Sequence, residues 1–383
     1  MPGSTYAGPV RRPAELPTLD ELRALAAEHG IEPLGVAPAT VMERARTELH
    51  RRRDAGLAAG MGFTYHDPDR ATDPTRAVPG ARSVIVGARS YLADAEPPRP
   101  PGPQARVARY AWVDHYAPLR DGLRAIARRI RAADHRAVAY ADDNAVVDRE
   151  VAHRAGLGWF GKNANVLLPG AGSWFVLGCI VTTAPYDPAA APVADGCGSC
   201  HRCLDACPTG AIVAPGVVDA NRCLAWVLQR PGPIAPALRA AIGDRIYGCD
   251  DCQEACPPTV HLGRRHRRPL PDGAVAWVDA LELLAADDQT LLDRHGRWYI
   301  AGRDPRWLRR NALVVLGNVA DPADTRAAEV LARYRHDDDP ILAEHARWAS
   351  DRLARAGRVS EASPSGLEGD GRKRRVPLEP TAS

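Results

Sequence analysis

Helical and strand patterns alternate along the first half of the chain. After Thr18, apolar residues recur at helical spacing with Leu22, Leu25 and Ala26 on one face, and Thr18 or Asp20 can cap the start of this helix. The elements expected beyond it are a strand at 83–88, a helix at 119–133, a strand at 136–141, a helix at 148–155 and a strand at 174–183. Such alternation predicts an α/β domain, which we place at residues 19–194.

Two later parts of the chain have different patterns. Residues 195–262 contain eight cysteines and little apolar periodicity, so inorganic clusters are expected to hold this module together. Residues 272–357 show helical apolar stripes throughout, which predict an α-helical domain of HEAT-like helix pairs. The two ends, residues 1–18 and 358–383, are rich in proline, glycine and polar residues and are predicted to be disordered.

Composition adds little about partners. The 383 residues carry a net charge of +3, and Lys162 and Lys373 are the only lysines. Arginine makes bidentate phosphate contacts, but an arginine-rich chain is also what a GC-rich genome produces. The most apolar stretch, 166–181, is interrupted by proline and glycine, and an acidic segment follows the first arginines where a signal peptide would be apolar. We therefore expect a cytoplasmic protein without a membrane partner.

Eight of the nine cysteines form a bacterial-ferredoxin pattern. The run C-x2-C-x2-C-x3-C-P begins at Cys197, and C-x2-C-x3-C-P begins at Cys249. By the crossed ligation of two-cluster ferredoxins, one [4Fe–4S] cluster takes Cys197, Cys200, Cys203 and Cys256, and the other takes Cys207, Cys223, Cys249 and Cys252. Structural zinc and disulfides are the alternatives, but all-cysteine zinc sites usually lack the x3-Cys-Pro ending. Cys179, the ninth, is expected to be a buried apolar residue of a strand.

Several short sequence motifs, taken together and in this order, resemble those of one known protein family. They are RxxDP at 70–74, PGARS at 79–83, ARYA at 108–111, AGLGWFGKN at 155–163, GSWF at 172–175, CGSCHRCLDACPTGAI at 197–212, YGCDDCQEACP at 247–257 and RNAL at 310–313. Together they resemble epoxyqueuosine reductase, the cobalamin-dependent iron–sulfur enzyme of queuosine biosynthesis in tRNA.

The resemblance implies a cofactor and a reaction. Cob(II)alamin would lie between the α/β domain and the cluster module without a histidine ligand, and the epoxide oxygen of the modified base would leave as water. Asp142 matches the family's proton donor. The residues expected to contact cobalamin are Arg70, Ala108, Asp142, Lys162, Asn163, Leu224, Gly248, Asp250 and Asp251. The expected partners are a tRNA carrying epoxyqueuosine and a ferredoxin or flavodoxin as electron donor, and we expect a monomer.

Simpler interpretations accompany these residues. Asp142 or Asp143 would serve as a helix cap, Lys162 as a surface lysine, and Asp250 and Asp251 as solvated loop carboxylates. The chain departs from the family pattern at Ala108, at 114–116 (DHY), after Cys223 and at 143–145 (DNA), close to the expected substrate side. Arginines at 294–310 would either hold tRNA phosphates or pair with surface aspartates.

Two other functions are compatible with the same motifs. A reductive dehalogenase would use the same cofactors on a halogenated substrate, although those enzymes usually look exported and lack a helical repeat after the clusters. A non-catalytic, ferredoxin-like electron carrier would need little more than the cysteine module. The long segment before that module favours an enzyme whose first domain receives the electrons.

Overall fold

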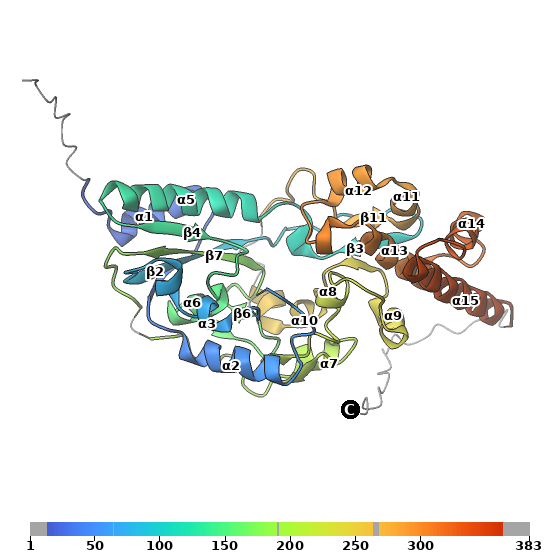
Figure 1. The fold of residues 1–383 in the computed structure, drawn as a ribbon, viewed down its shortest axis with the longest axis horizontal. Coiled ribbons are helices and arrows are strands. Elements are labelled where there is room, and N and C mark those ends of the chain that lie inside the picture. Colours follow the sequence, from blue (N-terminus) through green and yellow to red (C-terminus); the bar gives the residue numbers. More distant parts are fainter. Residues whose placement is uncertain (1–13, 64, 190, 263–267, 363–383) are drawn as a thin grey trace, which may run out of the picture.

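The computed structural model describes residues 14–63, 65–189, 191–262 and 268–362. An α/β part lies at one end of an elongated molecule, and helices α11–α15 lie at the other, with the short elements of the cysteine module beside both (Figure 1). In these ranges, none of the helices combines the length and the apolar character that crossing a membrane requires.

The first sheet has the strand order β1-β2-β7-β4, and all its pairs are antiparallel. Its strands are β1 (Leu34–Pro38), β2 (Ser83–Ser90), β7 (Phe175–Thr182) and β4 (Ala137–Tyr140). Helices α1 (Leu19–Glu28) and α5 (Tyr116–Ala132) cover one face, while α6 (Asp148–Arg154) lies on the other (Figure 1). The central strands read as continuous apolar runs because both of their faces are covered.

Successive residues of the central strands enter two separate cores. Ile85 packs with the buried faces of α1 and α5, whereas its neighbours Val84 and Val86 pack on the other side with α6. This follows from the two-residue period of a strand. Cys179 is fully buried in β7, as predicted, and burial raises the pKa of its thiol.

Several further elements of the first half were not predicted. They are α2 (Glu43–Asp54), α3 (Pro68–Ala71), α4 (Pro74–Ala77), β3 (Gln104–Val107), the 3-10 turn η1 (Arg109–Ala111), β5 (Trp159–Phe160) and β6 (Val166–Leu167). Two predicted boundaries are corrected. The backbone N–H of Ala14 donates to the carbonyl of Ala132, so residues 14–18 are not a disordered end, and α15 continues past residue 357. The remainder of the predicted disordered ends, 1–13 and 363–383, lies outside the described residues.

A second sheet joins three distant parts of the chain. Its order is β10-β3-β11, where β10 (Arg245–Tyr247) comes from the cysteine module and β11 (Trp277–Asp279) follows it. The strand β11 corrects the expectation that residues 272–357 are purely helical. It forms because β3 offers its second edge, and Ala105 and Arg106 oppose Val278 and Trp277 there.

The remaining elements are short in the cysteine module and longer after it. The module contains α7 (Arg202–Ala206), β8 (Ile212–Ala214), β9 (Val217–Val218), α8 (Leu224–Val227), α9 (Pro236–Ile242), α10 (Asp251–Glu254) and the π-helical turn η2 (Pro258–Leu262). It is followed by α11 (Ala280–Ala285), α12 (Asp288–His295), η4 (Ala301–Arg303), α13 (Arg306–Val319), α14 (Thr325–Tyr334) and α15 (Pro340–Ala362). Val227 and Ile246 share one core with Leu313 of α13 and Ala346 of α15, so the module and the helices pack as one body.

Arg310 connects α13 to the cysteine module from inside this core. Its guanidinium is fully buried and donates to the carbonyls of Val227, Leu228, Arg230 and Gly232 at 2.5–3.3 Å. Burial lowers its pKa to about 9. The side chain of Asn311 donates to the carbonyls of Leu228 and Ile246 at 2.8 and 3.1 Å. The RNAL motif therefore positions the loop after α8.

Replacing Arg310 by methionine is expected to lower the free energy of unfolding by about 3 kcal/mol or more, because several buried carbonyls lose their donor at once. Urea unfolding followed by circular dichroism measures this change. Arg306→Met on the same helix is the matched control. Its guanidinium is part-exposed and pairs with Asp304 and Asp339, so a change of about 1 kcal/mol or less is expected. Equal effects of the two substitutions would contradict a structural role for Arg310.

Candidate active site and cluster module

The thiols of Cys203 and Cys252 each interact electrostatically with three other cysteines of the module. Burial, together with the neighbouring thiols of Cys256, Cys197 and Cys200, raises the pKa of the Cys203 thiol to about 11. Burial likewise raises the pKa of Cys252, and its thiol neighbours are Cys249, Cys223 and Cys207. Electrostatic repulsion of this kind requires short separations. The Cys203 thiol thus interacts electrostatically with Cys256 of the second motif, and the Cys252 thiol with Cys207 of the first.

Among the described residues, no three His, Cys, Asp or Glu side chains converge as the ligands of one metal ion would. In a [4Fe–4S] cubane each thiolate binds a different iron, so the four sulfurs lie farther apart than the ligands of one zinc ion.

Lys162 and Asn163 hold the two cluster motifs against the α/β part. The Lys162 ammonium donates to the carbonyl of Gly198 at 2.7 Å, and the Asn163 amide donates to the carbonyl of Cys252 at 3.2 Å. Asn163 is buried. Lys162 is thus not a free surface lysine, and both residues contact cysteine loops.

Asp250 and Asp251 are buried rather than solvated. Asp251 accepts two hydrogen bonds of 2.6 Å from Arg245, and Asp250 accepts one of 2.8 Å from the backbone N–H of Arg109. Burial raises the pKa of Asp250 to about 6.

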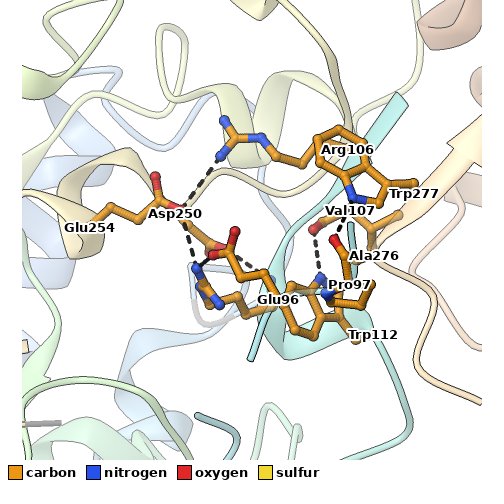
Figure 2. A pocket seen from close by; sticks show the side chains of 10 residues that line it. Glu96, Pro97, Arg106, Val107, Trp112, Asp250, Glu254, Ala276 and Trp277 are labelled. Carbon is orange, nitrogen blue, oxygen red and sulfur yellow. Dashed lines mark hydrogen bonds and ion pairs between the residues drawn. The ribbon is translucent and has the colours of Figure 1, made fainter. Parts of the chain in front are cut away.

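Asp250 lines a small cavity together with Arg106, Arg109 and Glu254 (Figure 2). Arg106 also lies 3.5 Å from Glu254. These contacts connect the second cysteine loop to β3. The alternative that Asp250 and Asp251 are solvated loop carboxylates is therefore wrong.

Ala108 and Gly248 are in direct contact. The Ala108 N–H donates to the carbonyl of Tyr247 at 2.9 Å, and Gly248 has φ +71°. A Cβ on Gly248 would lie 2.5 Å from that of Ala108 and 3.1 Å from the ring of Tyr110. Glycine is therefore required on both conformational and steric grounds. Leu224, directly after Cys223, is buried.

Asp142 lies just beyond the end of β4 with a left-handed φ of +55°. Its side chain is exposed, but desolvation raises its pKa, and Asp143 and Asp114 raise it further against the opposing effect of Arg120. The helix-cap alternative is wrong: α6 is capped by Val147 without a side-chain hydrogen bond. Asp143 instead accepts from the N–H of Ala145 at 2.8 Å. Asp142 is therefore available to hold a proton.

Several residues around Asp142 were not predicted. The Asp142 carboxylate raises the pKa values of Tyr116, Tyr247 and Asp148, and burial is the largest cause for all three. Arg149 acts to lower the pKa of Tyr116 and also that of Cys223, so this polar region extends to that cysteine. Asp148 and Arg149 begin a predicted helix, and no sequence signal separated them from ordinary first-turn residues.

Arg70, from α3, is exposed. Its charge opposes the rise that burial causes in the pKa of Tyr140 at the end of β4. Arg70 therefore lies near the end of β4, which Asp142 follows. The expected cobalamin residues thus divide into two sets. Arg70 and Asp142 lie at the open edge of the sheet, whereas the others are packed around the cysteine loops.

The arginines at 294–310 are mostly engaged within the protein. Arg306 and Arg309 pair with Asp304 and Asp288, and Arg310 is buried. Arg297 donates to the carbonyl of Trp112 at 3.0 Å. For Arg306 and Arg309 the structure agrees with surface pairing, and for Arg310 neither alternative holds.

The fold and the site define an iron–sulfur redox protein in which an α/β domain is joined to a two-cluster, ferredoxin-like module. Residues 196–259 match the model of the 4Fe-4S double cluster binding domain, and residues 71–147 match that of epoxyqueuosine reductase QueG, DUF1730. The chain belongs to the epoxyqueuosine reductase family.

The relatives cover nearly the whole chain. An epoxyqueuosine reductase of Xanthomonas campestris is 35% identical over 88% of this chain and 97% of its own length. That of Bacillus cereus is 30% identical over 88% and 90%. A crystal structure of epoxyqueuosine reductase with an epoxyqueuosine-modified tRNA-Tyr stem loop superimposes with a TM-score of 0.78 at 29% identity, over 91% of this chain and 94% of that one.

Proposed function

We propose that this protein reduces epoxyqueuosine in tRNA to queuosine, using two [4Fe–4S] clusters and cobalamin. The proposal is carried by the eight cysteines of the module, among which Cys203 interacts electrostatically with Cys256, Cys197 and Cys200, and Cys252 with Cys249, Cys223 and Cys207. The relative crystallised with an epoxyqueuosine-modified tRNA stem loop supports the substrate. A tRNA substrate also favours a cytoplasmic place of action.

The proposed cluster ligands follow the two groups. Cys197, Cys200, Cys203 and Cys256 hold one [4Fe–4S] cluster, and Cys207, Cys223, Cys249 and Cys252 hold the other. Buried thiols with raised pKa values are unfavourable as thiolates unless positive charge compensates them, and the iron of a cluster supplies that charge.

The residues between the α/β part and the cysteine module fit a cobalamin. Corrin side chains end in amides, which pair with carboxylates, hydroxyls and guanidinium groups, and such groups are gathered here in Asp142, Asp148, Tyr116 and Arg149. Arg70 is exposed, Ala108 contacts Gly248, and Leu224 is buried directly after Cys223. When bound, cobalamin supplies the low-potential electrons for opening the epoxide.

The protein's own contribution to the chemistry is the proton. Conversion of the epoxide to an alkene with loss of water consumes two electrons and two protons, and charge develops on the departing oxygen. A carboxylic acid can donate there if it remains protonated near neutral pH, and desolvation and two acidic neighbours favour that form of Asp142. We assign Asp142 as the proton donor.

The electrons would arrive singly from a soluble carrier of the ferredoxin or flavodoxin type, since the clusters exchange one electron at a time. We also propose that the protein acts as a monomer with the three parts expected from the sequence: the α/β domain, the cluster module and the HEAT-like helices.

Expression of the chain in a bacterial strain lacking its own epoxyqueuosine reductase tests the function. Mass spectrometry of digested tRNA is expected to show epoxyqueuosine converted to queuosine, a loss of one oxygen. A strain carrying the empty vector is the control. Persistence of epoxyqueuosine, although the purified protein contains iron and cobalt, would reject the proposal.

A further inference from the structure

The two cysteine motifs differ in their exposure to solvent. Four of the five residues at 198–202, in the first motif, are exposed, whereas every direct neighbour of Cys249 and Cys252 in the chain is buried. The helix of the first motif, α7, also lies at the rim of the molecule, on the side opposite α5 (Figure 1). Of the two proposed clusters, the one held by the first motif is therefore the one that a second protein can approach.

A part-exposed lysine connects three segments at this rim. The Lys162 ammonium donates to the carbonyl of Gly198 at 2.7 Å, and the Lys162 carbonyl accepts from the N–H of Gly216 at 2.9 Å. Gly216 forms the tip of the β8–β9 hairpin with a left-handed φ of +73°, and residues 213–215 before it are all exposed. Lys162, residues 198–202 and residues 213–216 together make the first-motif surface.

The first-motif surface carries cationic groups that are left without a carboxylate. Neither Lys162 nor exposed Arg202 forms an ion pair with any of the described residues. The carboxylates close to them in the chain are engaged, since Asp205 pairs with His201, and Asp195 accepts the N–H of the first cysteine at 2.9 Å. The charges available to a partner are therefore positive, which favours a partner that presents carboxylates.

Small side chains beside the cations allow a close approach. The exposed positions include Gly198, Ser199, Ala214 and Pro215. Electron transfer slows steeply as donor and acceptor move apart, so small residues over a cysteine loop suit a redox encounter. Such encounters bury less than about 1,200 Å² in total, which a surface of this kind can provide.

We propose that the first-motif surface is the docking site of a small, acidic one-electron carrier. This inference rests on the proposed function and deepens it, because it names the chemistry of the electron donor and its place of contact. In each encounter the reduced carrier is oxidised by one electron and the first-motif cluster is reduced by that electron, while no proton or covalent bond is transferred. Two encounters supply the two electrons that one epoxide consumes.

Carbodiimide cross-linking locates the contact, because this reagent joins amines to carboxylates without a spacer. The chain has only two lysines, Lys162 and Lys373, and Lys373 lies outside the described residues. Cross-linking of the enzyme loaded with clusters and cobalamin to a bacterial flavodoxin of net negative charge should join flavodoxin peptides to Lys162, as read by mass spectrometry. Lys162→Arg keeps the cation but lacks the reactive amine, so this cross-link should disappear. Cross-links found only at Lys373 or at the N-terminal amine would overturn the proposal.

Stopped-flow reduction of the clusters by reduced flavodoxin, without tRNA, tests the charge. Arg202→Glu is expected to slow the second-order rate about tenfold and to weaken its dependence on salt, because attraction becomes repulsion. Arg124→Glu is the matched control and should react as the wild type does, since its side chain is 61% exposed on α5, on the opposite side of the molecule (Figure 1). Iron content and the rate of reduction by dithionite should be the same in all three proteins.

Equal rates of Arg202→Glu and the wild type with flavodoxin at low salt would overturn the docking site. If Arg202→Glu slowed reduction by dithionite as much as reduction by flavodoxin, the residue would be structural and the proposal would fail as well. If flavodoxin reduces the clusters through this surface but epoxyqueuosine persists in tRNA, the docking site stands and the proposed function fails.

Discussion

Replacing Asp142 by asparagine is expected to reduce turnover of epoxyqueuosine-tRNA by about 10²-fold or more, while cobalamin and both clusters remain bound. Asparagine preserves the shape of the side chain but has no transferable carboxylic proton. It also tolerates a left-handed backbone such as the φ of +55° at this position, so the loop should keep its conformation. Single-turnover assays with reduced enzyme, alongside cobalt and iron content, measure the effect.

The pH dependence separates proton donation from a positioning role. The pKa of Asp142 is raised, so its donating form declines as the pH rises through that value, and the wild-type rate should fall toward alkaline pH. Asp142→Asn should lose this dependence. Asp143→Asn is the matched control, because Asp143 accepts the Ala145 N–H and is expected to retain near-normal turnover. If Asp142→Asn kept normal turnover and Asp143→Asn lost it, the proton donor would be Asp143 instead.

Cys207→Ser is expected to damage the cluster held by the second motif and leave the first motif's cluster intact. Cys207 belongs to the first motif in sequence, but its thiol raises the pKa of Cys252 in the second motif, as those of Cys249 and Cys223 do. Iron content of anaerobically purified protein should fall by about half, and electron paramagnetic resonance should show one remaining reduced cluster. Epoxyqueuosine reduction should be lost, because the damaged cluster adjoins the polar region around Asp142.

Cys256→Ser is the reciprocal change, since this thiol lies with Cys203, Cys197 and Cys200. It should remove the other cluster. Cys179→Ser controls for the loss of a buried thiol, because Cys179 lies within β7 and both clusters should persist. If Cys207→Ser removed the same cluster as Cys197→Ser, ligation would follow sequence order and the crossed assignment would be wrong.

Local signals in the sequence predicted the elements with strong patterns. The capping box of Thr18 and Glu21 marked α1, and the apolar runs of β2 and β7 marked the centre of the first sheet. The helix α2 was missed because none of its residues is buried, so it has no apolar stripe. The strands β3, β10 and β11 were missed because three or four residues carry little periodicity and their pairing is long-range.

The candidate site was predictable as far as residue type determines chemistry. Cysteine spacing predicted two groups of four, and the electrostatic neighbours of Cys203 and Cys252 agree with that division. Motif position alone does not say which surface a side chain meets: Lys162 and Asn163 contact cysteine loops. For Arg310, the charge suggested phosphate binding, but the side chain satisfies buried carbonyls. Such outcomes depend on distant packing that no local pattern records.

The placement of β3 at the centre of its sheet has a consequence for biosynthesis. Both of its partners, β10 and β11, are encoded far downstream, and one of them lies beyond the second cysteine motif. During translation, β3 therefore leaves the ribosome with two unpaired edges and remains so until most of the chain has been made. Unpaired edges invite association between chains. Expression at a lower temperature, or with chaperones that shield nascent chains, should therefore improve the yield of soluble protein more than a larger supply of iron does.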